Sequence, residues 1–241
     1  MKSILSCYFL ASVLLLWSCN DDKKTDTDVS KDSSAVVSTE PVSTNMIVTT
    51  PQNMVMVKHR VKDFAKWKVG YDSHDSMRLA NGLHNYVVAR GFMDSTMVMV
   101  AMRADDLTKA KAFAKDPALK AAMQKSGVTT PPTISFTILT YQDTSVVTGP
   151  ARSMTRFMVK DWAAWEKNFL EGTAERTENG LALRAYGHDA DDNNKVTVVT
   201  TILDSAKASN YWVSDKLKAR RAAGGVIGTP ERFLYRVVQR Y

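Results

Sequence analysis

The chain has 241 residues, of which 44% are hydrophobic and 24% are charged, and its formal net charge is +7 at pH 7. The basic residues are dispersed, which argues against a nucleic-acid partner and is compatible with anionic lipid head groups or acidic ligands. The densest basic run, residues 216–221, falls on an expected helix and is interpreted as a solvated face. With Cys7 and Cys19 as its only cysteines, the folded part is expected to lack disulfides and cysteine-based metal sites.

Residues 1–18 have the pattern of a secretory signal, with Lys2 before an apolar run over 4–17. That run is shorter than the roughly 20 residues of a membrane span. It ends in Leu-Trp-Ser-Cys, which resembles the bacterial lipobox and predicts lipidation of Cys19. The predicted location is the bacterial cell envelope, with a lipid anchor in the outer membrane or at a periplasmic membrane face rather than a cytoplasmic one. An ordinary signal peptide with an incidental cysteine is the alternative.

Residues 19–53 are predicted to form a disordered tether behind the lipidated cysteine. The segment is rich in Ser, Thr, Asp, Lys and Val, contains Pro41 and Pro51, and has no hydrophobic period. Such a composition buries too little apolar surface to order itself. It would hold the folded part away from the membrane.

Residues 54–148 predict a first folded unit. Strands are expected at 54–60, 84–92, 97–103 and 133–141, from their apolar and β-branched content. Asp63 is the expected N-cap of a helix that continues to about residue 80, where Asn81 and Gly82 stop it. A second helix follows Asp105 and breaks at Pro117. The order is that of the ferredoxin-like βαββαβ unit.

Residues 149–241 repeat this unit at a constant shift of 98 positions. The run Val-Lys-Asp-Phe-Ala-Lys-Trp at 61–67 returns as Val-Lys-Asp-Trp-Ala-Ala-Trp at 159–165, and the Asn-Gly-Leu run at 81–83 returns at 179–181. Strands are expected at 153–158, 183–188, 196–201 and 232–239, and helices at 161–178 and 204–223. A gap-free match of this length indicates an internal duplication.

The strand expected at 97–102 predicts how the two units associate. Every residue in it is apolar, so both faces of its sheet should be buried. The helices of one unit cover only one face. The predicted fold is therefore α+β, with two ferredoxin-like repeats packed sheet to sheet within one chain.

Each repeat resembles the antibiotic-biosynthesis-monooxygenase type of the dimeric α/β-barrel superfamily. The resemblance covers residues 54–241 and depends on the element order, the Val-Lys-Asp-aromatic run, the Asn-Gly turn and the Gly-Val before the last strand. It implies a barrel of two units, and activities that range from cofactor-free monooxygenases and haem-degrading enzymes to isomerases, dehydratases and domains without known activity. Haem-degrading relatives use an amide side chain on the first strand, and residues 54–60 have none.

Candidate site residues lie on the first helix. At 100° per residue, one arc holds Phe64, Trp67, Tyr71, His74, Arg78 and Asn81. His74 and Arg78 are the candidate catalytic residues, as a proton acceptor and an anion or carbonyl clamp beside an aromatic pocket. Alternatively, because Arg176 repeats Arg78, both arginines have a shared structural task, and His74 is half-exposed.

The candidate ligand-binding residues are His59, Trp67, Tyr71, His84, Tyr86 and Arg176. His59 and His84 are expected near one cavity mouth, but no histidine spacing matches a metal motif. No metal site and no cofactor are predicted, and the methionines are interpreted as core residues.

Two functional hypotheses follow. The first is a lipid-anchored barrel that binds a small apolar or aromatic molecule, with turnover of the cofactor-independent monooxygenase or isomerase kind. The alternative is a non-catalytic structural or partner-binding lipoprotein. The sequence does not decide between them, and it does not fix the oligomeric state.

Overall fold

The computed structural model describes residues 46–145 and 151–241. The predicted signal segment, Cys19 and most of the predicted tether lie outside these ranges, as does the expected boundary between the repeats. Within the described ranges, no helix has the length and apolarity needed to cross a membrane.

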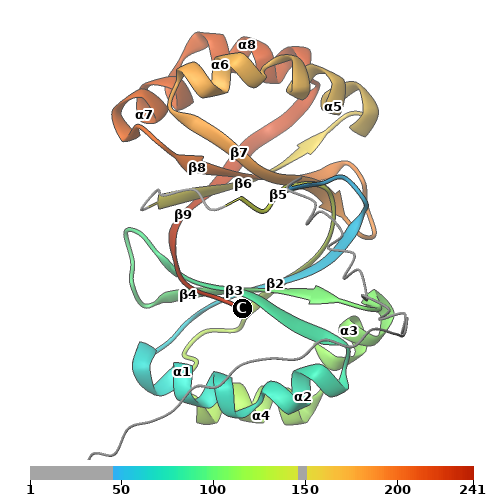
Figure 1. Cartoon of the computed structure of the whole chain (residues 1–241), viewed down its shortest axis with the longest axis vertical. Coiled ribbons are helices and arrows are strands. Elements are labelled where there is room, and N and C mark those ends of the chain that lie inside the picture. Colours follow the sequence, from blue (N-terminus) through green and yellow to red (C-terminus); the bar gives the residue numbers. More distant parts are fainter. Residues whose placement is uncertain (1–45, 146–150) are drawn as a thin grey trace, which may run out of the picture. The chain divides into compact units, whose positions relative to one another are not determined.

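The first repeat contains five strands and four helices, drawn in blue to yellow-green in Figure 1. Its strands are β1 (Ile47–Val48), β2 (Gln52–Arg60), β3 (Leu83–Gly91), β4 (Met97–Ala104) and β5 (Thr133–Asp143). Its helices are α1 (Phe64–Ser73), α2 (Asp75–Ala80), α3 (Leu107–Phe113) and α4 (Pro117–Lys125).

The second repeat has the same order from its first long strand onward. Its strands are β6 (Ala151–Val159), β7 (Leu181–Asp189), β8 (Lys195–Ile202) and β9 (Val226–Arg240). Its helices are α5 (Trp162–Glu171), α6 (Thr173–Glu178), α7 (Ser205–Val213) and α8 (Asp215–Ala223). The predicted βαββαβ order is confirmed in both repeats.

Repeated residues set the helix boundaries. The side chain of Asp63 accepts from the N–H of Lys66 at 2.6 Å, and Asp161 accepts from that of Ala164 at 2.7 Å. Both are N-caps, which satisfy N–H groups that a helix start leaves free. After each helix pair the chain turns through a glycine with positive φ, for example Gly82 at 68°, a conformation that glycine adopts without strain.

Two predicted boundaries are wrong. The single helices expected at 63–80 and 161–178 are each broken, at His74 and at Gly172, which are equivalent positions. The predicted tether also ends before residue 53, because β1 pairs with β5 and β2 already begins at Gln52. The pairing with β5 lapses between β1 and β2, where Pro51 lacks an N–H, so this segment does not have the pattern of a continuous strand. The predicted break at Pro117 is confirmed, since α4 begins there.

The strands close into a barrel, as the resemblance implied. The order is β1-β5-β2-β4-β3-β9-β6-β8-β7, and β7 also pairs with β5. Two seams thus join the repeats: β3 pairs with β9, and β5 pairs with β7. Helices α1–α4 cover the barrel on one side and α5–α8 on the other (Figure 1).

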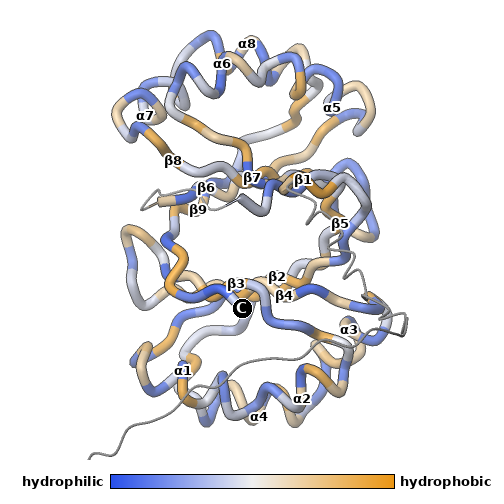
Figure 2. Tube along the Cα trace, viewed as in Figure 1, coloured by the Kyte–Doolittle hydropathy of each residue, from blue (hydrophilic) through white to orange (hydrophobic). Residues whose placement is uncertain are grey.

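The faces of β4 confirm that both sides of the sheet are buried. Val98, Val100 and Met102 pack with the helices of the first repeat. Met99 and Ala101 point into the barrel and join a core that also contains residues of the second repeat, Met154, Ala185 and Tyr235. In Figure 2, several central strands carry long apolar stretches, whereas the helices alternate between apolar and polar residues.

Candidate functional site

A cavity of about 70 Å³ lies between the helices of the first repeat and its strands. It contains five of the predicted site residues: His59, Trp67, Tyr71, His74 and Arg78. The rest of the wall is almost wholly apolar and includes Val57, Val100, Met102, Phe113 and Ile134.

His59 is the unusual residue of this wall. Its side chain is 3% exposed, and neither ring nitrogen has a hydrogen-bond partner within the described residues. The ring lies 5.6 Å from that of Trp67. Burial lowers the pKa of His59 to about 4, so the imidazole is neutral at pH 7. A neutral imidazole offers one donor and one acceptor, and neither is paired within the described residues.

Arg78 is held by neighbouring residues. Its guanidinium donates to the carbonyl of Tyr71 at 2.7 Å, to Asn85 Oδ1 at 3.1 Å and to Asp75 Oδ1 at 3.1 Å. It also lies 3.7 Å from the centre of the Tyr71 ring. These contacts connect α1, α2 and β3, which supports the structural interpretation of this arginine.

The same connection recurs in the second repeat. Arg176 donates to the carbonyl of Phe169 at 2.6 Å and lies 3.8 Å from the Phe169 ring. Phe169 occupies the position of Tyr71, so each arginine bonds the carbonyl seven residues before it, across the helix break. This shared contact is structural. The catalytic role of Arg78 and the ligand-binding role of Arg176 stay predictions.

His74 lies at the helix break and is half-buried at the cavity wall. Its Nδ1 is 2.6 Å from the carbonyl oxygen of Gly70, a contact that requires a proton on Nδ1. The other nitrogen, Nε2, is then an acceptor. His74 thus remains a candidate for proton transfer, at the rim rather than at the centre.

The structure does not bring His84 and Tyr86 to this cavity. His84 is exposed and lies 3.0 Å from Asp105 Oδ2. Tyr86 faces the barrel interior, where it lines a separate cavity of about 60 Å³ between the repeats. The expectation of a common mouth for His59 and His84 is wrong because they lie on different strands, β2 and β3, with His84 turned outward.

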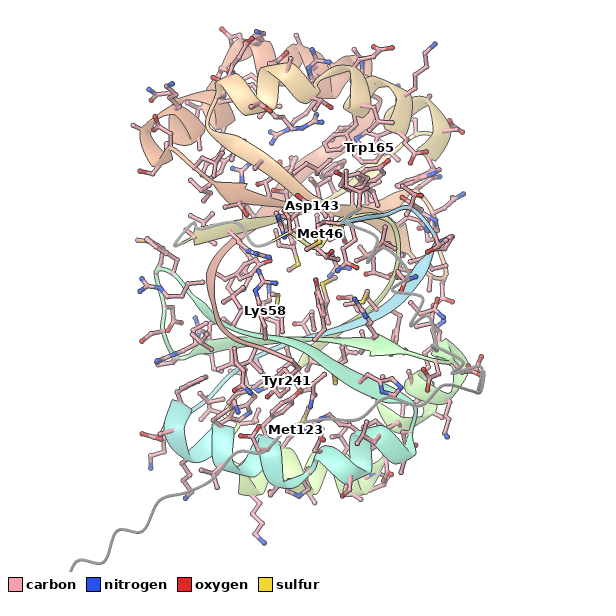
Figure 3. All side chains as sticks on the ribbon, viewed as in Figure 1. Met46, Lys58, Met123, Asp143, Trp165 and Tyr241 are labelled. Atoms are coloured by element: carbon pink, nitrogen blue, oxygen red, sulfur yellow. The ribbon has the colours of Figure 1, made fainter. Side chains whose placement is uncertain are left out.

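An open cleft of about 760 Å³ adjoins the cavity beside α4. Ala114, Leu119, Met123 and Ile134 line both spaces. None of the residues of α4 is buried. Figure 3 labels Met123 in the helical layer of the first repeat. The cavity and the cleft are therefore neighbours that share part of one wall, on a helix without buried residues.

Asn85 is a site residue that sequence reasoning missed. It receives hydrogen bonds from Tyr71 and Arg78 and donates to Asp75 Oδ1 at 2.6 Å. Its place results from a register shift in the pairing of β3 with β4 at this residue. Its sequence signal is weak, because Asn85 stands in a strand that also contains His84 and Arg90.

No family model matches the sequence, and no curated protein matches it either. Among solved structures, the chain is similar to an anthrone oxidase-like protein, with a TM-score of 0.54, 14% identity, and coverage of 80% of this chain and 94% of that one. It is also similar to a candidate chlorite dismutase, with a TM-score of 0.53, 14% identity, and coverage of 78% and 96%. It is similar as well to a candidate monooxygenase from Fusobacterium nucleatum, with a TM-score of 0.50, 13% identity, and coverage of 80% of this chain and 94% of that one.

These likenesses define the fold. The chain has the ferredoxin-like α/β barrel of monooxygenase-like proteins, with both units of the barrel in one polypeptide. Identities of 13–14% carry no substrate or reaction to this chain.

Proposed function

We propose that the cavity of the first repeat binds a small, largely apolar or aromatic molecule that carries one hydrogen-bonding group, with His59 as its polar contact. The observation that supports this proposal most is the pair of buried ring nitrogens without partners. Leaving such groups unpaired costs about 1–3 kcal/mol each, which a ligand hydroxyl or carbonyl would recover.

The second repeat supports the same view, because it has Phe157 at the position of His59. The fold therefore accepts an apolar ring at this place on the first strand, and a histidine there is not needed for packing. The turnover that suits such a site is proton transfer, of the isomerase or cofactor-independent monooxygenase kind, with neutral His59 as a hydrogen-bonding group that orients the ligand.

The proposal is tested by titrating the full chain with phenol and with toluene, which share a shape and differ in the hydroxyl group. We expect phenol to raise the Tm, since a ligand at 100 times its Kd adds about 2.7 kcal/mol of stability, and toluene to bind at least tenfold more weakly. His59→Phe should bind the two equally. His84→Phe, which changes an exposed histidine outside the cavity, should keep the preference of the parent.

If the parent binds neither molecule, or binds both with the same affinity, the cavity does not recognise a hydroxyl group. The alternative of a non-catalytic structural or partner-binding lipoprotein then gains support. If His59→Phe keeps the preference, another group recognises the hydroxyl.

We also propose that the protein is exported and lipid-anchored through Cys19, as the lipobox-like run before it indicates. Mass spectrometry of the protein from a bacterial membrane fraction should show an N-terminal diacyl- or triacyl-cysteine at this position. Cys19→Ala should remove the lipid, whereas Cys7→Ala should not. An unmodified N-terminus in the parent would contradict the anchor.

A further inference from the structure

The second repeat contains a cavity of about 90 Å³ at the place equivalent to that of the first, between α5–α8 and the strands. Its wall has a different chemistry. Four arginines line it: Arg176, Arg220, Arg221 and Arg232. Hydroxyl groups of Ser153, Thr155 and Thr200, and the aromatic rings of Phe157, Trp165 and Trp212, form much of the rest.

The fold itself does not require this charge. Arg232 occupies the position of Ile134, and Arg221 that of Met123, both of which line the first cavity. The strand registers confirm the equivalence, since Thr155 pairs with Arg232 as Val57 pairs with Ile134. The same fold therefore has an apolar cavity wall in the first repeat and a cationic one in the second.

Only one of the arginines is neutralised by a close contact. Glu175 accepts from Arg220 Nη2 at 2.6 Å and from the Tyr211 hydroxyl at 2.7 Å, and Lys216 lies 3.9 Å from the same carboxylate. Within the described residues, no carboxylate forms an ion pair with Arg176, Arg221 or Arg232. The cavity thus has an excess of positive charge.

Two guanidinium nitrogens of this group are buried without a partner, Nε of Arg176 and Nε of Arg232. Arg176 is 6% exposed, and Arg232 lies 4.0 Å from the centre of the Trp212 ring. Burial lowers the pKa of each to about 10, which leaves both charged at pH 7. Charged donors held away from water are unfavourable unless an acceptor reaches them.

We propose that this second cavity binds a small oxyanion, the carboxylate or phosphate group of a small molecule, between Arg232, Arg221 and Arg176. A planar carboxylate or a tetrahedral phosphate accepts the paired N–H groups that a guanidinium presents. The aromatic walls would hold an apolar body attached to the anion. This site is separate from the first cavity and does not depend on the function proposed for it.

The test is calorimetric titration of the full chain with benzoate, with inorganic phosphate, and with uncharged benzamide, which has the shape of benzoate. We expect saturable binding of at least one of the two anions at one equivalent, and at least tenfold weaker binding of benzamide. Benzoate binding alone assigns an organic carboxylate, and phosphate binding alone assigns a phosphate group. Added salt should weaken the binding of the anion, because it screens the attraction between the anion and the arginines.

The decisive variants place the residue of the first repeat into the second. Arg232→Ile and Arg221→Met should each reduce anion binding at least tenfold without lowering the Tm. Arg236→Ile, which removes an exposed arginine of the same strand, and His59→Phe should both leave it unchanged. No saturable binding of either anion, equal binding of benzamide, or retention of binding in Arg232→Ile and Arg221→Met would overturn the proposal.

Discussion

His59 makes the stability of the fold depend on pH in a defined window. Its pKa is about 4 in the folded protein and 6.5 in its ordinary state. Below pH 6.5 the unfolded chain takes up a proton that the folded chain does not, so stability falls as the pH drops from 6.5 towards 4. The loss should reach about 3 kcal/mol, measured by urea unfolding across this range.

The matched control is His59→Phe, which should lose little stability over the same window and should be more stable than the parent at pH 5. Carboxylates whose pKa is lowered, such as Asp94 and Asp106, weaken the fold only below their ordinary value of 3.8. If the free energy of unfolding falls equally steeply with pH in parent and variant between pH 6.5 and 4, His59 is not a buried histidine without a partner.

Sequence reasoning located some of these residues and missed others for a physical reason. The helical arc placed Trp67, Tyr71 and Arg78 correctly on one wall, because their spacing fixes their direction. It interpreted the run 216–221 as a solvated face, whereas Arg220 and Arg221 line a cavity. Comparing the repeats position by position, with Arg232 against Ile134, would have exposed the difference.

At the scale of elements, each broken helix pair is joined by one arginine. Arg78 bonds the last turn of α1 to α2 and β3 from a side chain that is only 7% exposed. Arg78→Met should lower the free energy of unfolding by about 2 kcal/mol, because it leaves the Tyr71 carbonyl and Asn85 without their charged donor. Urea unfolding at pH 7 measures this loss.

Arg60→Met is a suitable comparison, since it removes an exposed arginine paired with Asp94 and should cost less than about 0.5 kcal/mol. If the two variants are equally stable, Arg78 does not hold the helix pair together, and its assignment as a catalytic clamp gains weight.

The break itself was not predictable from periodicity. Residues on both sides of His74 stay on one arc, so a straight helix and a broken one give the same apolar pattern. The signal lies in the repeat, where Gly172 replaces His74 and weakens the helix at the equivalent position. Caps were predictable, because Asp63 and Gly82 act through local backbone contacts.

At the scale of the whole barrel, the seam between β5 and β7 depends on the absence of a side chain. Gly187 pairs with Leu139, and a Cβ there would lie 2.0 Å from the carbonyl oxygen of Ile138. Gly187→Ala should destabilise the protein by about 3 kcal/mol, since backbone atoms cannot yield as a flexible side chain can.

Gly224→Ala is the control, because its Cβ would first meet the end of the Asn168 side chain, at 3.0 Å. It should change the midpoint of urea unfolding much less. A parent-like midpoint for Gly187→Ala would mean that the seam is wider than described. The apolar strand at 97–102 predicted that the sheets face each other, and the resemblance implied a barrel. Which edges join was not predictable, since edge pairing depends on the length and curvature of strands.

A barrel built from two identical subunits must carry two identical cavities, because any substitution appears in both. Here a single polypeptide supplies both halves, and β9 holds them together by pairing with β6 and β3. Because the two halves share one chain, their sequences can differ, and the two cavities differ in chemistry: one is apolar with a single buried imidazole, and the other is lined by arginines. If both proposed sites bind, one molecule holds an apolar ligand and an anionic ligand in a one-to-one ratio.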